Sequence, residues 1–463
     1  MSDSDFEGNE SRDFAADARE IVLELHARLG EGSPQPRLEP TRKVVEMLGD
    51  VHRAYPIIQV AGTNGKTSTA RLIESILRTY GLRTGLFTSP HLVHLAERIQ
   101  VDGEPIIDEK FVDNWRDIEP YIRLVDEELR EAGEPRLTYF EVLSILAFAA
   151  FADAPVDVAV IEVGLGGEWD STNVADADVA VFTPIDLDHM ERLGSTIRAI
   201  AQTKSGIIKP DSLVVSAPQQ PDAREVLREA AERANSTIRF TDDPGLSVSS
   251  TLAVGGQLLT ITGIAARYED IFLSLYGAHQ AVNAQLAVLA VESFIGGGSQ
   301  QLDPEVISEA FATVTSPGRL QLLATEPTVL VDAAHNPHGA RSLATALGEF
   351  FTFDDVTCVF AGLADKDVRG MLSALAPVAS RFIVPDLDTE RAMPAAEIAL
   401  LAREVAPDVE VHTAATVAEA LAHARARAAA TSEDAAVVVA GSIVLVGETI
   451  ALAQATRGWR DFT

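Results

Sequence analysis

The sequence has almost no cysteine and no long hydrophobic run. Cys358 is the single cysteine among 463 residues, which excludes a disulfide framework and a zinc site built from cysteines. The longest apolar run, residues 142–152, contains Ser144 and is too short to span a bilayer. The first five residues include no basic side chain, so they lack the basic start of a signal peptide. We therefore expect a cytoplasmic protein that does not bind a membrane.

Basic residues are also scarce. Lys and Arg number 37 against 69 Asp and Glu, which gives a formal net charge of −32. That charge argues against a general surface for nucleic acid or for an anionic membrane. There is no Gly-x-Gly-x-x-Gly pattern to support NAD binding. The length suggests two or three domains, and we expect a monomer.

What the chain does contain is a glycine-bracketed loop between a strand and a helix. The mostly apolar residues 57–61 predict a buried strand, and residues 67–80 predict a helix. Backbone N–H groups at a helix start attract anions, and glycines let the loop turn tightly around a phosphate. A Gly-Asn turn can also be an ordinary turn between two elements that binds no ligand. Strand, loop and helix together favour a site for ATP phosphates, with Mg²⁺ on the Thr67 or Ser68 hydroxyl. Its members are Gly62, Thr63, Asn64, Gly65, Lys66, Thr67 and Ser68.

Two motifs carry a family resemblance. The loop Gly-Thr-Asn-Gly-Lys-Thr is shorter than the common phosphate loop and resembles that of the Mur ligase superfamily. Residues 88–92, Thr-Ser-Pro-His-Leu, with Glu-Arg-Ile at residues 97–99, resemble folylpolyglutamate and dihydrofolate synthases. The resemblance implies that Ser89 contacts Mg²⁺ and that Pro90, His91 and Arg98 border the folate site. Without it, His91 and Arg98 would be expected on the surface.

Three further residues are candidates for metal binding. Glu162 ends the apolar strand 156–163, at the edge of a parallel sheet where ligands bind. His189 stands beside Asp186 and Asp188, an arrangement that suits a metal but also a helix cap. The resemblance implies that His189 binds a second Mg²⁺ and that Lys204 is carbamylated and supplies an anionic oxygen ligand. Two Mg²⁺ sites are thus expected, formed by Thr67, Ser89, Glu162, His189 and Lys204.

Other segments predict the rest of the first domain. Residues 236–276 alternate in a β-rich pattern, which we interpret as a small antiparallel patch on the main sheet. Residues 277–284 resemble a family motif that implies adenine and phosphate contacts from His279, Gln280 and Asn283. Glu168 and Trp169 depart from the Arg-Leu pair that the family usually shows. The remaining predictions are helices 14–29 and 41–48 and strands 84–88, 179–183 and 211–216.

After the linker at residues 316–321 the chain alternates strands with alanine-rich helices, as in an open, mostly parallel sheet of Rossmann type. The resemblance continues here. It implies that Arg319 reaches the ATP phosphates, that Asp332 binds the ribose, and that His335 and Ser442 lie near the incoming glutamate.

The sequence therefore predicts an α/β protein. We expect a disordered acidic tail (residues 1–13), an ATP-binding domain of the Mur ligase type (14–316) and a smaller Rossmann-like glutamate-ligase domain (317–463). The implied activity is ATP-dependent addition of L-glutamate to a folate or dihydropteroate carboxylate through an acyl phosphate. Lys66, His189, Lys204 and Arg319 would be catalytic. The alternatives are another amino-acid ligase of the Mur type and a noncatalytic nucleotide-binding regulator.

Overall fold

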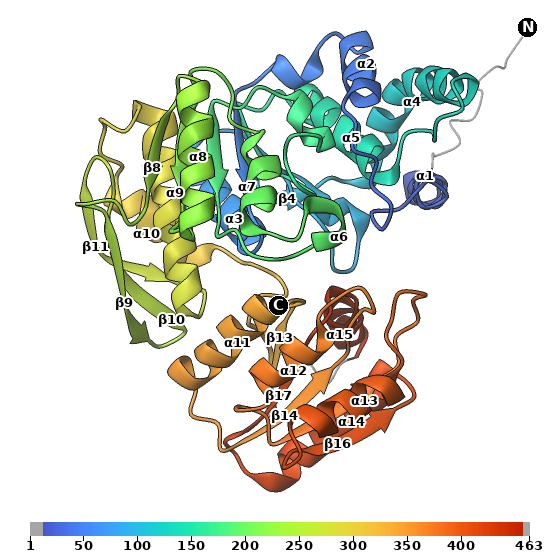
Figure 1. The fold of residues 1–463 in the computed structure, drawn as a ribbon, viewed down its shortest axis with the longest axis vertical. Coiled ribbons are helices and arrows are strands. Elements are labelled where there is room, and N and C mark those ends of the chain that lie inside the picture. The colour runs from blue at the N-terminus through green and yellow to red at the C-terminus, as the bar shows by residue number, and fades with distance from the viewer. Residues whose placement is uncertain (1–12, 457–463) are drawn as a thin grey trace, which may run out of the picture.

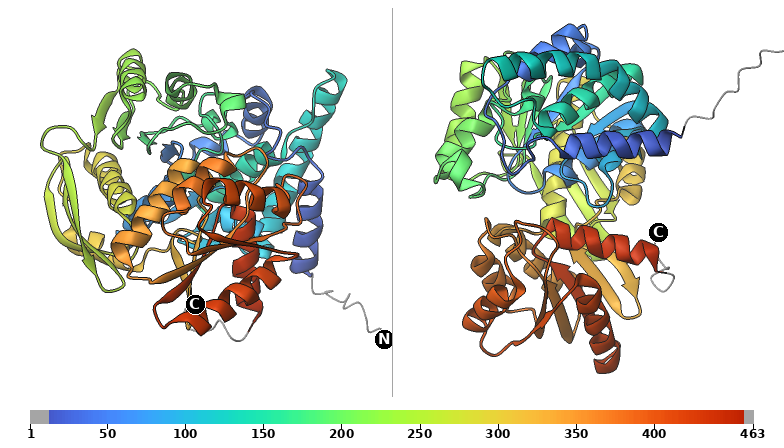
Figure 2. Two further views of the ribbon diagram at one scale, coloured as in Figure 1. Left: turned by 60° about the horizontal axis from the view of Figure 1, so that its bottom comes forward. Right: turned by 90° about the vertical axis from the view of Figure 1, so that its right-hand side faces the viewer.

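The computed structural model describes residues 13–456, which form two α/β domains one below the other (Figure 1). The predicted α/β fold, with a larger N-terminal and a smaller C-terminal sheet domain, is confirmed. The right-hand view of Figure 2 shows the C-terminal domain below the N-terminal one. The predicted tail lies outside the described residues except for Asp13, whose side chain accepts a hydrogen bond from Ala16 N and caps the first helix.

The N-terminal domain is built on an eight-stranded sheet in the order β4-β3-β2-β5-β1-β6-β7-β8. Its six strands from β2 to β8 are parallel, whereas β3 runs antiparallel to both β2 and β4. The strands are β1 (Ile57–Ala61), β2 (Thr84–Phe87), β3 (Ile99–Val101), β4 (Glu104–Pro105), β5 (Val158–Glu162), β6 (Val179–Phe182), β7 (Leu213–Ser216) and β8 (Thr237–Phe240).

Helices cover both faces of this sheet, so its central strands are buried throughout. Ile57 packs into a core with α1, α2, α4 and α5, and its neighbour Ile58 packs on the opposite face with α3, α9 and α10. The helices are α1 (Phe14–His26), α2 (Glu39–Met47), η1 (Val51–Arg53), α3 (Lys66–Thr79), η2 (Leu95–Arg98), α4 (Asp108–Glu131), α5 (Tyr139–Asp153), η3 (Ser171–Val174), α6 (Met190–Leu193), α7 (Ile197–Ser205), α8 (Pro221–Arg233), α9 (Ala278–Gly296) and α10 (Pro304–Thr313).

The structure corrects one topological prediction. Within residues 236–276, β8 joins the main sheet as a parallel strand, but the next three strands form a sheet of their own. These are β9 (Ser247–Ala253), β10 (Gly256–Thr262) and β11 (Arg267–Leu273), all antiparallel. One face of this small sheet packs on α9 and α10 through Leu259, Ile261 and Ile271, which is why it stands beside the main sheet instead of extending it.

Some predicted boundaries also shift. The helix predicted at residues 14–29 ends at His26. The helix predicted at 41–48 begins at Glu39, with Pro40 in its first turn, where the missing proline N–H leaves no bond unmade. The strand predicted from residue 211 begins at Leu213, because Asp211 adopts a left-handed backbone with φ 59°.

The C-terminal domain has a six-stranded sheet in the order β12-β13-β17-β14-β15-β16, parallel except for the edge strand β12. Helices again cover both faces. No helix among residues 13–456 is long and apolar enough to cross a membrane. The elements are β12 (Gln321–Thr325), β13 (Thr328–Asp332), α11 (Pro337–Phe350), β14 (Asp355–Phe360), α12 (Val368–Leu375), β15 (Arg381–Pro385), α13 (Ala395–Val405), β16 (Glu410–Ala414), α14 (Val417–Thr431), β17 (Ala435–Ala440) and α15 (Ile443–Ala455).

Candidate active site

A cavity of about 1170 Å³ lies where the two domains meet. Its walls come from the loop between β1 and α3, from the ends of β5 and β6, and from the starts of α9 and α11. It brings together most of the predicted site residues: Thr63, Asn64, Gly65, Lys66, Thr67, Ser68, Ser89, Pro90, Glu162, His189, Asn283, Arg319, Asp332, His335 and Ser442. Gly62, His91, Arg98 and Lys204 lie outside its lining.

The shape of the phosphate loop depends on its two glycines. Gly62 has φ 147°, and a Cβ there would lie 1.8 Å from Thr183 Oγ1. Gly65 has φ 90°, and its Cβ would lie 2.7 Å from Asn283 Oδ1. Neither position can carry a side chain without moving its neighbours. The loop therefore packs closely against β6 and α9, which leaves the start of α3 open to the cavity.

Lys66 is folded back over this loop. Its Nζ donates to the carbonyls of Gly62 (3.3 Å) and Thr63 (3.2 Å). Burial lowers the pKa of Lys66, and the charge of Glu162 opposes that shift. An ammonium at the start of α3, held only by carbonyl groups of the loop, is placed to contact phosphate oxygens.

Glu162, Thr67 and Ser89 meet at the end of β5. Thr67 Oγ1 lies 3.0 Å from both carboxylate oxygens of Glu162, and Ser89 N donates to Glu162 Oε2 at 3.2 Å. Burial raises the pKa of Glu162, while Lys66 lowers it. Carboxylate and hydroxyl oxygens fit the ligand preference of Mg²⁺. Within residues 13–456 no group of three or more His, Cys, Asp or Glu side chains could hold a metal, so phosphates and water would have to complete the coordination.

The other two predicted metal ligands stand apart. His189 adopts a left-handed backbone with φ 49° before α6, and its Nε2 lies 3.9 Å from Asp188 Oδ2. Lys204 is buried on α7 beneath the phosphate loop and donates to Gly62 O at 2.7 Å. Burial, together with the charge of Lys66, lowers the pKa of Lys204 to about 7. A substantial fraction of Lys204 is therefore neutral near pH 7.

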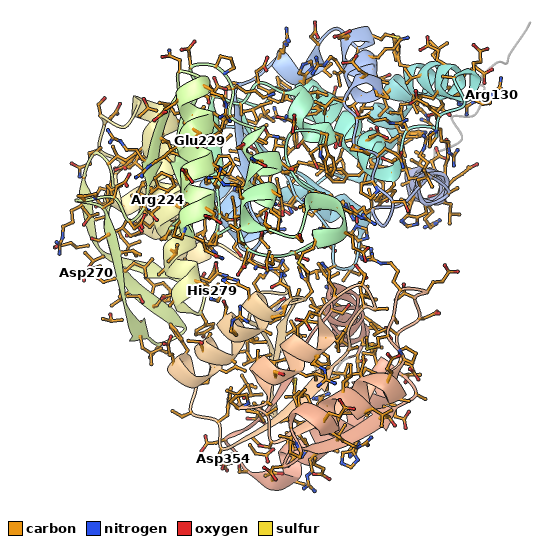
Figure 3. All side chains as sticks on the ribbon, in the orientation of Figure 1. Arg130, Arg224, Glu229, Asp270, His279 and Asp354 are labelled. Atoms are coloured by element: carbon orange, nitrogen blue, oxygen red, sulfur yellow. The ribbon has the colours of Figure 1, made fainter. Side chains whose placement is uncertain are left out.

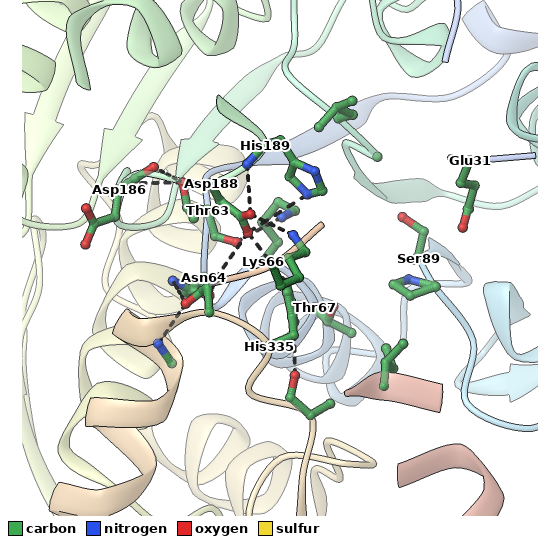
Figure 4. Close-up of a pocket in the computed structure, with 18 of the residues that line it drawn as sticks. Glu31, Thr63, Asn64, Lys66, Thr67, Ser89, Asp186, Asp188, His189 and His335 are labelled. Carbon is green, nitrogen blue, oxygen red and sulfur yellow. Dashed lines mark hydrogen bonds and ion pairs between the residues drawn. The ribbon is translucent and has the colours of Figure 1, made fainter. Parts of the chain in front are cut away.

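Asp188 is a central residue of the site that sequence reasoning passed over in favour of His189. Its carboxylate accepts from Lys366 Nζ at 2.7 Å and Asn336 Nδ2 at 3.1 Å, and His335 Nε2 lies 3.6 Å away. Figure 4 labels Asp188 and His335 in this arrangement. Burial raises the pKa of Asp188, but His335, His189 and Lys366 outweigh it and hold that pKa well below its usual range. The available signal was its place directly before His189 in a strand-end loop.

On the C-terminal side, Asp332 fixes the interdomain linker. Its carboxylate accepts from Leu320 N and Ala334 N, both at 2.8 Å. These bonds hold the backbone on either side of the carboxylate and so position Arg319, which lines the cavity and donates to Gly318 O. The predicted ribose contact of Asp332 would have to coexist with these bonds.

The start of α9 lies opposite the linker. Figure 3 labels His279 where the N-terminal domain faces the C-terminal one. Burial, with the charge of Arg319, lowers the pKa of His279 to about 4. Gln280 Nε2 donates to Ser68 Oγ at 3.3 Å and Asn283 Nδ2 donates to Gln280 Oε1 at 3.0 Å. The predicted adenine-binding segment thus contacts the phosphate loop directly.

His91 and Arg98 line a second, smaller hollow of about 230 Å³. Arg98 is only 3% exposed; its Nε donates to His91 Nδ1 at 2.8 Å and its Nη1 pairs with Glu31. Arg98 is therefore not the surface residue that composition alone suggested. Glu31 lines both hollows, so the two predicted residues adjoin the main cavity without facing it.

Part of the lining of the main cavity is apolar. Phe140, Leu165 and Trp169 line it, and Gly164 lets the Phe140 ring lie so close that a Cβ on the glycine would be 2.4 Å from it. The cavity lining therefore combines aromatic residues with a phosphate loop, which suits a ligand with a flat ring system and an anionic group.

This fold and this site define a two-domain nucleotide-dependent enzyme whose phosphate loop opens into an interdomain cavity. The Mur ligase middle domain matches residues 60–291, and the Mur ligase glutamate ligase domain matches residues 318–443. The dihydrofolate synthase/folylpolyglutamate synthase of Mycobacterium tuberculosis is 42% identical over 450 residues, 92% of each chain. The corresponding Bacillus subtilis protein is 35% identical over 369 residues, 80% of this chain and 85% of that protein.

Solved structures of related proteins have the same fold as this chain. Mycobacterium tuberculosis folylpolyglutamate synthase complexed with ADP has a TM-score of 0.90 at 42% identity, covering 95% of this chain and 99% of that one. Escherichia coli FolC in complex with DHPP and ADP has a TM-score of 0.82 at 28% identity, covering 96% and 99%. The chain belongs to the folylpolyglutamate synthase family of the Mur ligase superfamily.

Proposed function

We propose that this protein is an ATP-dependent ligase that joins L-glutamate to the carboxylate of a folate or dihydropteroate. The observation that carries the proposal is one cavity whose lining includes the phosphate loop, the aromatic residues Phe140 and Trp169, and His335 and Ser442 from the C-terminal domain. The names of the relatives support the same activity.

The reaction needs two steps at one place. The folate carboxylate attacks the γ-phosphate of ATP, which gives an acyl phosphate and ADP. The amine of glutamate then attacks the acyl carbon and displaces phosphate. Because the first step brings two anions together, Lys66 and Arg319 are proposed to face the transferring phosphate. His335 and Ser442, on the opposite wall, are proposed to contact glutamate.

Thr67, Ser89 and Glu162 would hold one Mg²⁺, and His189 with a carbamylated Lys204 would help hold a second. Bound Mg²⁺ would neutralise the negative charge that builds up on the phosphates. Support for the carbamate is that carbamylation requires a neutral amine, and Lys204 is buried with a pKa of about 7. A free ammonium there would repel a metal, whereas a carbamate would attract it.

The test is ADP release with dihydropteroate and tetrahydrofolate in parallel, each with glutamate, and mass spectrometry of the products. We expect ADP and a product heavier by one glutamate residue with at least one of them. ADP release only with an unrelated carboxylate would indicate another ligase of the Mur type. ATP binding without turnover would indicate the regulatory alternative. A single species of the chain mass, 49.5 kDa, in light scattering would support the proposed monomer.

A further inference from the structure

A polar network joins the two domains across the cavity. We call its five members, Asn64, Asp188, Asn336, His338 and Lys366, the interdomain clasp. Asn64 and Asp188 come from the N-terminal domain, and the other three come from the C-terminal domain. Figure 4 labels Asn64 and Asp188 among the residues that line the cavity, with dashed lines to neighbouring groups.

The first half of the clasp starts in the phosphate loop. Asn64 exchanges amide hydrogen bonds with Asn336, with Nδ2 to Oδ1 distances of 3.4 and 3.0 Å, and its Nδ2 lies 2.9 Å from His338 Nδ1. Asn336 Oδ1 also accepts from Gly339 N at 2.8 Å and caps α11. The tip of the phosphate loop is thus bonded directly to the start of a helix in the other domain.

The second half is the ion pair of Asp188 and Lys366. Their side chains are 9% and 8% exposed, and the N–O distance is 2.7 Å. Asn336 Nδ2, at 3.1 Å from Asp188, links this pair to the first half. A nearly buried charge is unfavourable without its partner. The pair therefore favours the one alignment of the two domains in which Asp188 meets Lys366.

We propose that the clasp keeps water from the acyl phosphate, with Asp188 and Lys366 acting as positioning residues. This inference rests on the proposed function. In ligation the glutamate amine forms a C–N bond, the C–O bond to phosphate breaks, and the amine proton ends on phosphate. If water attacks the same carbon, the products are the original carboxylate, phosphate and a proton, and the ATP has been used without ligation. All five clasp side chains line the cavity, so their bonds hold the two domains together at the cavity wall.

The decisive variant is Lys366→Met, and the readout is the ratio of ADP released to amide product formed. The wild-type enzyme should give a ratio of about one, because each amide bond requires one ATP. The variant should still release ADP, but we expect the ratio to rise at least about threefold, because water reaches the acyl phosphate before glutamate does. Lys110→Met is the matched control. Lys110 also pairs with a carboxylate, Asp153 at 3.0 Å, but on the surface of the N-terminal domain, so its ratio should stay at about one.

A second variant guards against misfolding. Lys366→Met leaves Asp188 buried without its cation, whereas Asp188→Asn combined with Lys366→Met leaves no unpaired charge and should fold. The same rise in the ratio is expected in the double variant. If ADP release and ligation fall together and the ratio stays at one in the folded double variant, the clasp has no role in excluding water and the inference is overturned. Failure of the wild type to release ADP with either folate would instead refute the proposed function.

Discussion

The phosphate loop has a lysine on each of its two sides, and both lysines donate to the same carbonyl, that of Gly62. Lys66, on the cavity side, makes a long bond of 3.3 Å, and the charge of Glu162 raises its pKa against the effect of burial. Lys204, on the α7 side, makes a shorter bond of 2.7 Å and is buried, with a pKa near 7. Burial lowers the pKa of both lysines, but Lys66 is only partly buried and lines the cavity, whereas Lys204 is buried and lies outside the lining. Lys66 is therefore placed to contact phosphate, and Lys204 is the lysine proposed to be modified.

We expect the largest loss of activity from Lys66→Ala, which removes the lysine on the cavity side. We expect ATP turnover to fall more than tenfold, a loss above about 1.4 kcal/mol of transition-state stabilisation, with the melting temperature little changed, because Lys66 bonds only to loop carbonyls. Steady-state ADP release and thermal melting measure the two. Retention of more than about a tenth of the activity would show that the cavity-side lysine is not the phosphate ligand.

The next largest effect tests the lysine on the other side. Lys204→Ala should be nearly inactive, and a short carboxylic acid in solution should restore part of the activity by occupying the vacated space. Lys204→Arg should not be rescued, because its cation fills that space. Carbon-13 NMR after bicarbonate labelling should detect the carbamate on the wild type and not on either variant. An unmodified Lys204 in an active enzyme would contradict the proposed carbamate.

A measurement of stability against pH tests whether Lys204 is buried as a neutral amine. Burial lowers the pKa of unmodified Lys204 to about 7 in the folded chain, against about 10.5 for a free lysine, and CO₂-free buffer would keep the amine unmodified. Between these values the unfolded chain binds more protons, so the free energy of unfolding rises with pH through this window. Raising the pH from about 7 to about 9 should stabilise the wild type by about 2 kcal/mol relative to Lys204→Met. Urea unfolding of both proteins at both pH values measures the difference, and equal pH responses would mean that Lys204 is not buried as a neutral amine.

The last test concerns the loop as a whole. ATP with Mg²⁺ should raise the melting temperature by a few degrees, because ligand bound to the native state alone stabilises it by about 2.7 kcal/mol at a hundredfold excess over Kd. GTP should protect less, since Asn283 and Asp332 are predicted to bind adenosine, and NAD should protect less because it lacks the γ-phosphate that the loop is predicted to bind. Equal protection by NAD would contradict a site built around the ATP phosphates.

The elements that carry the phosphate loop could be predicted from the sequence. A strand, a loop with Gly62 and Gly65 and a helix follow one another in the chain, so their pattern is readable directly. Glu162 could be placed because parallel strands end at a common edge. The separate β9–β11 sheet could not be predicted, because alternation identifies a strand but not the sheet that it joins. The pairing of Asp188 with Lys366 was out of reach for a related reason: 178 positions separate the two residues.

The clasp also bears on how the protein ages in storage. An asparagine loses its amide when the backbone nitrogen of the next residue attacks the side chain and closes a five-membered ring. Asn336 is followed by Pro337, whose nitrogen carries no hydrogen, so this route is closed. Asn64 is followed by Gly65, which offers no side chain to hinder the attack. We therefore expect slow conversion to a carboxylate at position 64 and not at 336, which peptide mapping of stored protein would reveal. Each converted molecule would place a new negative charge in its own phosphate loop.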